Sequence, residues 1–437
     1  MTTLAERPHR EQDARRATRP LVILEGIALL FAAPWLLFPD LFPVATAVAL
    51  AALAAVWLLG LVIDRTLLPR TPFNLTLLLF CLALAVGVLA SADPADTLSK
   101  ATGVVLGLAV WRFVVIAAGR RGHIGVAVVL LLLICLGFSL TGIANLRELP
   151  KIPFLVAANP FRNLPLSGLD RLATHPNQLA ALIGLFLPLL VSLLAAPPRR
   201  LAAPLWRLAP ALVALLVVAI LILTQSRGGW IAAIAGLYVL LLLWAAVLPP
   251  SRARRVLRWI ALAGALVVVA GVLWIGPGTL WELWLNPPEE TALGTLATLD
   301  LRRKMWPWAV TAIGDFPFTG VGLGAFRQVA FRLYPLPIWP DYDMGHAHNI
   351  FLQTALDVGL PGLVAYVAVL FVAAAVGWRI ARRDPGFRPV SLGLLAGLVA
   401  LHVFGLADAL VLGAKPALVF WFALGLLAAM NKEGLES

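Results

Sequence analysis

The sequence predicts an all-α integral membrane protein with about twelve transmembrane helices. Of its 437 residues, 61% are hydrophobic and only 13% are charged, whereas about a quarter of the residues in soluble domains are charged. A soluble fold of this size cannot hide so much apolar surface, because folded proteins keep a large polar exterior. The composition therefore excludes a soluble enzyme, a disordered chain and a disulfide-stabilised scaffold.

Long apolar stretches recur along the chain at the length that crosses a membrane. A hydrocarbon core about 30 Å thick needs about 20 apolar residues per helix. The first two stretches are separated only by Pro39 and Asp40, which predicts a tight helical hairpin. A window of that length predicts twelve spans, at 20–38, 41–63, 73–92, 98–118, 123–143, 177–196, 205–224, 228–248, 257–275, 360–378, 390–412 and 415–430.

The distribution of basic residues predicts how the chain is oriented. Cytoplasmic segments of membrane proteins carry an excess of Lys and Arg. With the N-terminus inside, 22 of the 34 Lys and Arg residues fall on inner segments, among them Arg112, Arg200 and Arg383. An even number of spans then places both termini in the cytoplasm. The net charge of +12 thus reflects orientation in the bilayer, and no nucleic-acid partner is expected.

The spans divide the chain into seven parts. Two outer connections exceed the roughly 15 residues at which a loop is usually functional or disordered, and the second is rich in Trp, Tyr, Pro and Gly. Its tryptophans suit either anchors at the membrane interface or platforms for sugar rings. The parts are a basic cytoplasmic tail (1–19, read as preceding a retained anchor), helices 1–5 (20–143), an outer loop (144–176), helices 6–9 (177–275), a large outer loop expected to hold the site (276–359), helices 10–12 (360–430) and a cytoplasmic tail (431–437).

Arginines on the outer face are candidates for binding phosphate. Arg227 lies in a very short outer turn, Ser226-Arg227-Gly228. Arg302 and Arg303 belong to the strongest outer cationic cluster, and Arg302 shares a helix face with Trp306, four residues on. A guanidinium can hold a diphosphate with two parallel hydrogen bonds. Contact with lipid headgroups is the alternative for both positions, and the local sequence leaves the choice open.

Two further motifs resemble a nucleotide loop and a metal site, but neither ligand is predicted. The glycine-rich run 320–324 resembles a nucleotide loop but lacks the surrounding βαβ unit, so a turn is predicted. Asp341 and Asp343 could join His346 and His348 around a metal ion. The two histidines would point to different faces of a helix, and the ligand spacing matches no recognised site. No metal and no cofactor are therefore predicted.

The most specific motif is His346-Ala347-His348-Asn349, followed after nine residues by Gly359 and then by Gly362. It places histidines where the large outer loop re-enters the membrane. An imidazole can be neutral near pH 7 and accept a proton, so it can serve as a general base. A histidine that caps an interfacial helix is the alternative, and the residues alone do not decide between the two.

This motif resembles the signature of the O-antigen ligase and O-antigen polymerase superfamily. Ser226-Arg227-Gly228 is similar to the family's first arginine motif, and Arg302 has the family's spacing to Trp306. The run from Pro317 to Phe326 and the triplet 175–177 (His-Pro-Asn) also fit. The resemblance covers roughly 170–375 well and agrees with the predicted topology of the whole chain.

The resemblance implies a metal-independent membrane glycosyltransferase of the GT-C type, working on the outer face of the inner membrane. Its donor would be a glycan on undecaprenyl diphosphate, and its acceptor a hydroxyl of a glycan or lipid among the membrane lipids. His348 would be the catalytic base, and Arg227 and Arg302 would bind the donor diphosphate. His346, Asn349 and Arg303 would support the site. Direct attack by the acceptor would invert the anomeric carbon.

Three alternatives stay open at this point. The enzyme could be a polymerase that joins repeat units, or a protein O-oligosaccharyltransferase. Some superfamily relatives have been proposed as inorganic-carbon transporters. A transporter needs ionisable groups along a path through the bundle, and Glu25, His402 and Asp408 are the candidates. Because most reactive groups lie on the outer face, the sequence favours an enzyme.

Overall fold

The computed structural model describes residues 6–65, 67–119, 123–146, 152–162, 164, 174–196, 204–288, 297–335, 345–410 and 412–436. Every regular element within these residues is helical. The helices are α1 (Glu6–Leu37), α2 (Pro43–Asp64), α3 (Asn74–Leu89), α4 (Pro94–Ala118), α5 (Ile124–Gly142), η1 (Ile143–Leu146), α6 (Pro153–Ala157), α7 (Pro176–Ala195), α8 (Pro204–Leu223), α9 (Arg227–Val247), α10 (Arg252–Ile275), α11 (Pro277–Leu285), α12 (Ala297–Asp315), α13 (Phe326–Leu333), α14 (Ile350–Arg383), α15 (Arg388–Gly405), η3 (Lys415–Ala417) and α16 (Leu418–Glu436).

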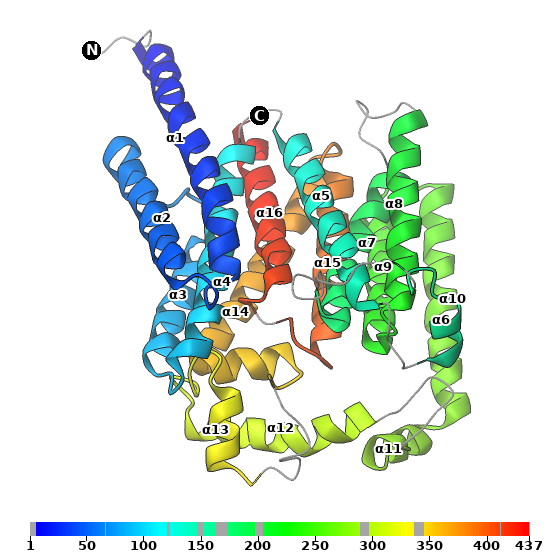
Figure 1. Ribbon diagram of the computed structural model, residues 1–437. Helices are drawn as coiled ribbons and strands as arrows, with labels where there is room; N and C mark the ends of the chain where they lie inside the picture. Colours follow the sequence, from blue (N-terminus) through cyan, green and yellow to red (C-terminus); the bar gives the residue numbers. More distant parts are fainter. Residues whose placement is uncertain are drawn as a thin grey trace.

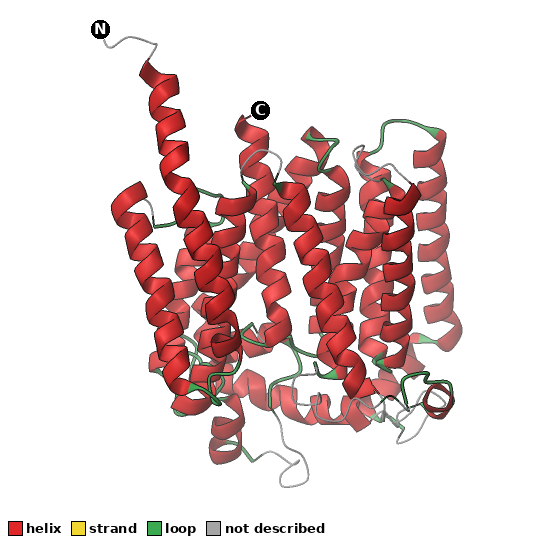
Figure 2. Ribbon diagram, turned by 45° about the horizontal axis from the view of Figure 1, so that its top comes forward, coloured by secondary structure: helices red, strands yellow, loops and turns green. Residues whose placement is uncertain are grey.

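The long helices run side by side as one bundle, as Figures 1 and 2 show. Within the described residues, nine are long and apolar enough to cross a membrane, namely α1, α2, α4, α5, α7, α9, α10, α14 and α15. The all-α membrane class is thus confirmed. Each of the twelve predicted spans overlaps a helix, while the count of twelve crossings stays a prediction.

The large outer loop predicted over 276–359 contains several helices. It holds α11, α12, α13 and the first turns of α14. Figure 1 places α11, α12 and α13 at one end of the bundle, and the free ends of α1 and α16 at the opposite end. No residue of α11 is buried. An exposed apolar helix that contains Trp281 and Trp284 fits the interfacial anchors expected of this segment.

Helix α15 forms the centre of the C-terminal half and packs between α7 and α9. Small residues allow this close approach. A Cβ atom built on Gly397 would lie 2.1 Å from the backbone oxygen of Leu185 in α7, and one on Gly393 would lie 2.6 Å from the Cα atom of Leu189. Small residues four apart are typical of tightly packed membrane helices. The packing brings the start of α7 next to the chain that follows α15.

Helix α14 is kinked where it meets the glycine-rich turn 320–324. Val358 and Gly359 leave the helical conformation, and Gly359 has φ +71°. A Cβ atom on Gly359 would lie 2.4 Å from the oxygen of Phe318, so glycine is required there. The predicted turn is present, and the backbone N–H of Val321 donates to the oxygen of Leu356 over 2.8 Å. The turn therefore braces the short first segment of α14 against its long second segment.

A buried ion pair joins the N-terminal helices. Arg112 of α4 donates to the carboxylate of Glu25 in α1, and both residues are buried. The indole of Trp57 in α2 donates to the same carboxylate over 3.2 Å. The sequence had assigned Arg112 to the cations of an inner segment. The side chain lies inside the bundle with a carboxylate partner, and its Nε also donates to the oxygen of Leu67 over 2.9 Å, so the side of the membrane stays a prediction.

Candidate active site

The two histidines of the HxH motif lie in a turn that precedes a helix. Residues 345–349 are not helical, and α14 begins at Ile350 with Asn349 as its N-cap. The Asn349 side chain accepts from the backbone N–H groups of Phe351 and Leu352, and donates to the oxygen of Leu406 over 3.1 Å. His348 has φ +47°, an unusual conformation for an L-residue. The expectation of different helix faces was therefore wrong, and the two rings lie 4.3 Å apart.

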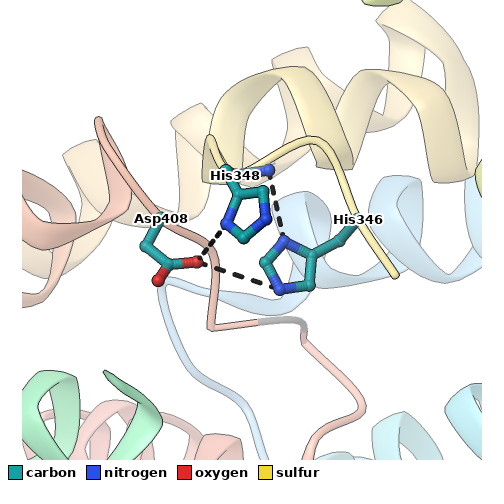
Figure 3. A group of neighbouring side chains, drawn as sticks. All are labelled: His346, His348 and Asp408. Atoms are coloured by element: carbon teal, nitrogen blue, oxygen red, sulfur yellow. Dashed lines mark hydrogen bonds and ion pairs between the residues drawn. The ribbon is translucent and has the colours of Figure 1, made fainter. Parts of the chain in front are cut away.

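Both histidines face one carboxylate, that of Asp408 in the loop after α15 (Figure 3). His348 Nδ1 lies 2.9 Å from Asp408 Oδ1, and His346 Nε2 lies 3.8 Å from the same atom. The other oxygen accepts a hydrogen bond of 2.8 Å from Asn177 Nδ2 at the start of α7. Asp408 Oδ1 also accepts from the backbone N–H of Ala409. The carboxylate is thus held by two other segments of the chain, the histidine turn and α7, and by the backbone of its own loop.

These contacts assign the protons on the two rings. A carboxylate only accepts hydrogen bonds, so His348 donates from Nδ1, which leaves the lone pair on Nε2. His346 Nδ1 accepts from the backbone N–H of His348 over 3.2 Å, so a neutral His346 carries its proton on Nε2. His348 therefore presents a basic nitrogen, whereas the acceptor atom of His346 is already engaged by the protein.

The electrostatics agree with this assignment. Burial, reinforced by the charge of His348, lowers the pKa of His346 to about 4, although Asp408 acts in the opposite direction. Burial alone would raise the pKa of Asp408, but the hydrogen bond from His348 and the charges of both histidines outweigh it and lower that pKa to about 2. Near neutral pH the site thus contains an ionised Asp408 and an uncharged His346.

Two of the predicted arginines come together beside this carboxylate. Arg227 is the first residue of α9, whose N-cap Ser226 accepts from the N–H of Gly229. Arg302 lies in α12 and is half-buried. Burial lowers the pKa of Arg302, the charge of Asp408 raises it, and the charge of Arg227 lowers it again. The two guanidiniums are therefore close enough to repel each other, an arrangement that favours an anion between or beside them.

Arg303 has a different environment from Arg302. Its guanidinium donates to Asp300 Oδ1 over 2.9 Å, and Lys304 Nζ lies 2.6 Å from Asp300 Oδ2. The Arg303 side chain is 38% exposed. Two adjacent arginines of α12 thus have different partners: Arg302 interacts with the charges of Asp408 and Arg227, and Arg303 forms a local ion pair. The supporting role predicted for Arg303 stays a prediction and has less structural support than the role of Arg302.

The turn between the histidines is fixed through its backbone. The indole N–H of Trp306 in α12 donates to the oxygen of Ala347 over 3.0 Å. The N–H of Ala347 donates to Gln353 Oε1 over 2.8 Å. Gln353 Nε2 donates to Asp357 Oδ1, which also accepts from the backbone N–H of Gly324. The glycine-rich turn and α12 therefore both reach the histidine turn.

The sequence interpretation missed the role of Asp408, which it treated as a group at the interface or in a transport path. Its partner Asn177 had been noted only within the His-Pro-Asn triplet. A lone carboxylate at the end of an apolar stretch was the available signal. Asp341 and Asp343 lie outside the described residues. Ligand atoms of His346, His348 and Asp408 lie within 4.8 Å of one another and could hold a metal ion, so a possible donor set exists that the sequence did not predict.

Comparison with known proteins supports the resemblance drawn from the motifs. Residues 211–367 match the family model for O-antigen ligase. The chain therefore contains an O-antigen ligase segment. A search of curated proteins finds no significant match. The O-antigen ligase segment includes Arg227, Arg302 and both histidines of the HxH motif, whereas Asp408 lies beyond its end. The family predicted from sequence is thereby confirmed.

Proposed function

We propose that the protein transfers a glycan from a polyprenyl diphosphate, of the undecaprenyl type, to an acceptor hydroxyl. The reaction takes place at the end of the bundle that holds α11, α12 and α13, on the outer face of the inner membrane. The observation that carries the proposal is the hydrogen bond between His348 Nδ1 and Asp408, set beside a pair of arginines. The proposed base and the proposed diphosphate site are then neighbours.

The chemistry is a single displacement. His348 Nε2 takes the proton of the acceptor hydroxyl, and the oxygen attacks the anomeric carbon. The bond from that carbon to the diphosphate breaks, and its electron pair leaves on the diphosphate oxygen. Arg227 and Arg302 stabilise the charge that develops there. One displacement inverts the anomeric carbon, and the proton on His348 passes to solvent after the products separate.

Asp408 acts through His348 in this scheme. It fixes the tautomer that leaves the lone pair on Nε2, and it stabilises the imidazolium that forms when the proton arrives. Asn177 and the N–H of Ala409 hold the carboxylate in place. His346, neutral above about pH 4, supports the turn by accepting from the backbone of His348. Asn349 caps α14 and so fixes the end of the motif.

The decisive experiment is reconstitution of purified protein in liposomes with an undecaprenyl-diphosphate glycan and a panel of acceptors. His348→Ala should lower the rate of transfer by about 10²–10⁴, the usual cost of a lost general base. Asp408→Asn should lower the rate of transfer by a similar factor, because an amide at this position favours the wrong tautomer of His348. Thermal unfolding and donor binding should change little. Wild-type turnover by His348→Ala would remove the base assignment.

The same panel separates the alternative acceptors. Product on a lipid–oligosaccharide core indicates a ligase, product on a second donor molecule indicates a polymerase, and product on a protein hydroxyl indicates an O-oligosaccharyltransferase. The ligase is our first choice because the matched family segment bears that description. The site described above would serve all three, since each acceptor presents a hydroxyl.

The cluster of His346, His348 and Asp408 favours one second candidate, a metal-assisted transfer. We prefer the hydrogen-bonded arrangement, because His348 Nδ1 and Asp408 already satisfy each other at 2.9 Å. Transfer after treatment with a chelator distinguishes the two. Full activity in the chelated protein supports the base, whereas loss that is restored by one divalent ion supports the metal.

The contacts of the described residues give little support to the hypothesis of a transporter. Glu25 pairs with Arg112, His402 accepts from the hydroxyl of Tyr366 over 2.7 Å, and Asp408 belongs to the histidine cluster. Each group is thus engaged in a separate local pair. Proteoliposomes that take up labelled bicarbonate in the absence of the glycan donor would favour transport.

A further inference from the structure

The backbone of Ala347 is held by two side chains, one from each neighbouring helix. Trp306 Nε1 donates to its oxygen over 3.0 Å, and Gln353 Oε1 accepts from its N–H over 2.8 Å. Ala347 is fully buried, so these are the bonds that replace water at this peptide. Because Ala347 separates His346 from His348, any rotation of its backbone moves both rings relative to Asp408.

The turn needs such support. His348 has φ +47°, a conformation that costs more for an L-residue than the ordinary regions and persists only when the surroundings fix it. Gln353 is itself fixed, since its Nε2 donates to Asp357 Oδ1 over 2.8 Å. Asp357 also accepts from the N–H of Gly324 over 2.9 Å. The chain of bonds therefore runs from the histidine turn through α14 to the glycine-rich turn.

Trp306 connects the histidine turn to the helix that contains Arg302. It lies one turn after Arg302 on α12, so the helix that presents the guanidinium also grips the turn that presents His348. We propose that Trp306 and Gln353 are positioning residues that set the distance between the base and the diphosphate site. This inference rests on the proposed function. It predicts that loss of either bond lowers turnover while donor binding survives.

A packing role is the competing explanation, since the ring of Trp306 also lies 5.7 Å from that of Trp284. Trp308 supplies a matched control on the same helix. Its ring lies 5.8 Å from that of Tyr334 and packs in the same apolar cluster as Trp306. Trp308→Phe removes as much surface as Trp306→Phe, but leaves the bond to Ala347 in place.

The test compares these two variants in the liposome assay. Trp306→Phe should lower kcat by about 10- to 100-fold, the cost of a small misplacement of reacting groups, with the KM for donor nearly unchanged. Trp308→Phe should stay near wild type. Hydrogen exchange of the peptide that contains Ala347 should quicken in Gln353→Met. Equal losses in the two tryptophan variants, or a loss confined to donor KM, would overturn the proposal.

Two further measurements cover the cases in which a variant does not fold or the proposed function fails. Should Trp306→Phe fail to fold, Gln353→Met carries the same kinetic comparison, with unchanged kcat as the contradicting outcome. Should His348→Ala retain full turnover, the proposed function fails. The exchange of Ala347 then still reports whether Gln353 holds this turn, because that measurement needs no activity.

A separate feature lies at the opposite end of α14. An open surface cavity of about 560 Å³ is lined, among the residues that the structure describes, by Arg379, Arg382, Arg383, Trp378 and Ala375. These residues follow the three- and four-residue spacing of one helix face. The three arginines are exposed, and none takes part in an ion pair within the described residues. The nearest following acid, Asp384, accepts from the backbone N–H groups of Gly386 and Phe387.

We infer that this cavity binds the headgroup of an anionic phospholipid. Guanidiniums grip phosphate oxygens in pairs, and basic recesses on the cytoplasmic side of membrane helices suit such headgroups. Trp378, half-buried at the same level, provides the interfacial ring against which a lipid's glycerol region packs. The last turns of α14, whose first residue follows the histidine turn, would then be fixed by a lipid of the inner leaflet.

Helix α10 offers a matched control. Its first turns expose Arg252, Arg255 and Arg258, which carry the same charge without lining the cavity described above. Native mass spectrometry of wild type in phosphatidylglycerol should show retained lipid that is absent in phosphatidylcholine. The triple variant R379Q/R382Q/R383Q should lose one bound lipid, and R252Q/R255Q/R258Q should not. Equal losses would indicate a diffuse basic surface, and displacement by inorganic phosphate alone would indicate a soluble-anion site. Either result overturns the inference.

Discussion

Asp408 decides how two neighbouring histidines differ in chemistry. Its hydrogen bond with His348 fixes one tautomer, and the backbone fixes the other tautomer in His346. The two rings are two residues apart in sequence, yet only one keeps a lone pair for a substrate. Under the proposed function the motif needs only one base, and the contact with Asp408 selects His348 for that role.

The pH dependence of turnover should isolate that base. Asp408, with its pKa near 2, stays ionised as pH falls from 8 to 5, and its stabilising effect is lost only as pH falls further toward 2. His346, with its pKa near 4, stays neutral over the same window. We expect His346→Gln to keep the shape of the profile between pH 5 and 8. A profile displaced along the pH axis in this variant would contradict the assignment.

The two adjacent arginines of α12 should differ in kinetics. Arg302→Ala removes a charged donor near Asp408 and Arg227, and should lower donor use by about 10- to 100-fold, as expected for a hydrogen bond to a charged group. Arg303→Ala breaks an exposed pair with Asp300, and such pairs contribute little. Donor titration of both variants checks this. Similar losses would mean a diffuse patch of positive charge.

At the scale of helices, the contact of α7 with α15 places Asn177 beside Asp408. Gly397 allows that contact, because a Cβ atom there would lie 2.1 Å from the oxygen of Leu185. Gly397→Ala should lower the free energy of unfolding by about 1–3 kcal/mol, the usual cost of overpacking. Gly271→Ala in α10, where nothing lies within 4 Å of the added atom, is the control. Thermal unfolding in detergent measures both.

The control also defines the contradicting result. Alanine favours helix over glycine, so Gly271→Ala should unfold at an equal or higher temperature. If Gly397→Ala behaves in the same way, the two helices do not depend on this close approach. The position of Asp408 would then have to be set by its loop and not by α15.

Short-range patterns explain what the sequence could predict. The apolar stretches predicted the membrane helices, and the spacing of Arg302, Trp306 and the HxH motif predicted which side chains to examine. Asp408 is 60 residues away from His348, and their contact depends on how α15 packs against α7. The turn before Ile350 depends on the cap at Asn349 and on bonds from other helices. Neither follows from a local pattern.

Across the whole molecule, the orientation in the membrane is the broadest prediction. Reporter fusions at Arg200 and Arg383 should be cytoplasmic, and fusions at Arg162 and Asp341 extracytoplasmic, because inner segments carry the excess of cations. The α11–α13 end of the bundle, opposite the free ends of α1 and α16 in Figure 1, would then face outward. If Arg200 and Asp341 report the same side, the span count is wrong and the site faces the wrong substrate pool.

The ion pair between Glu25 and Arg112 has a consequence for how the chain is made. The two residues are 87 positions apart, which corresponds to about 4–17 s of translation at the usual rates. A lone charge costs about 2.5–3.5 kcal/mol at the centre of a transmembrane helix on insertion scales, and less at the position of Glu25 near the start of the Pro20–Leu37 span. During that interval α1 contains an acid whose partner has not been synthesised. The first hairpin is therefore expected to linger at the insertion machinery until α4 emerges, an interval that arrested nascent chains of graded length would expose to crosslinking.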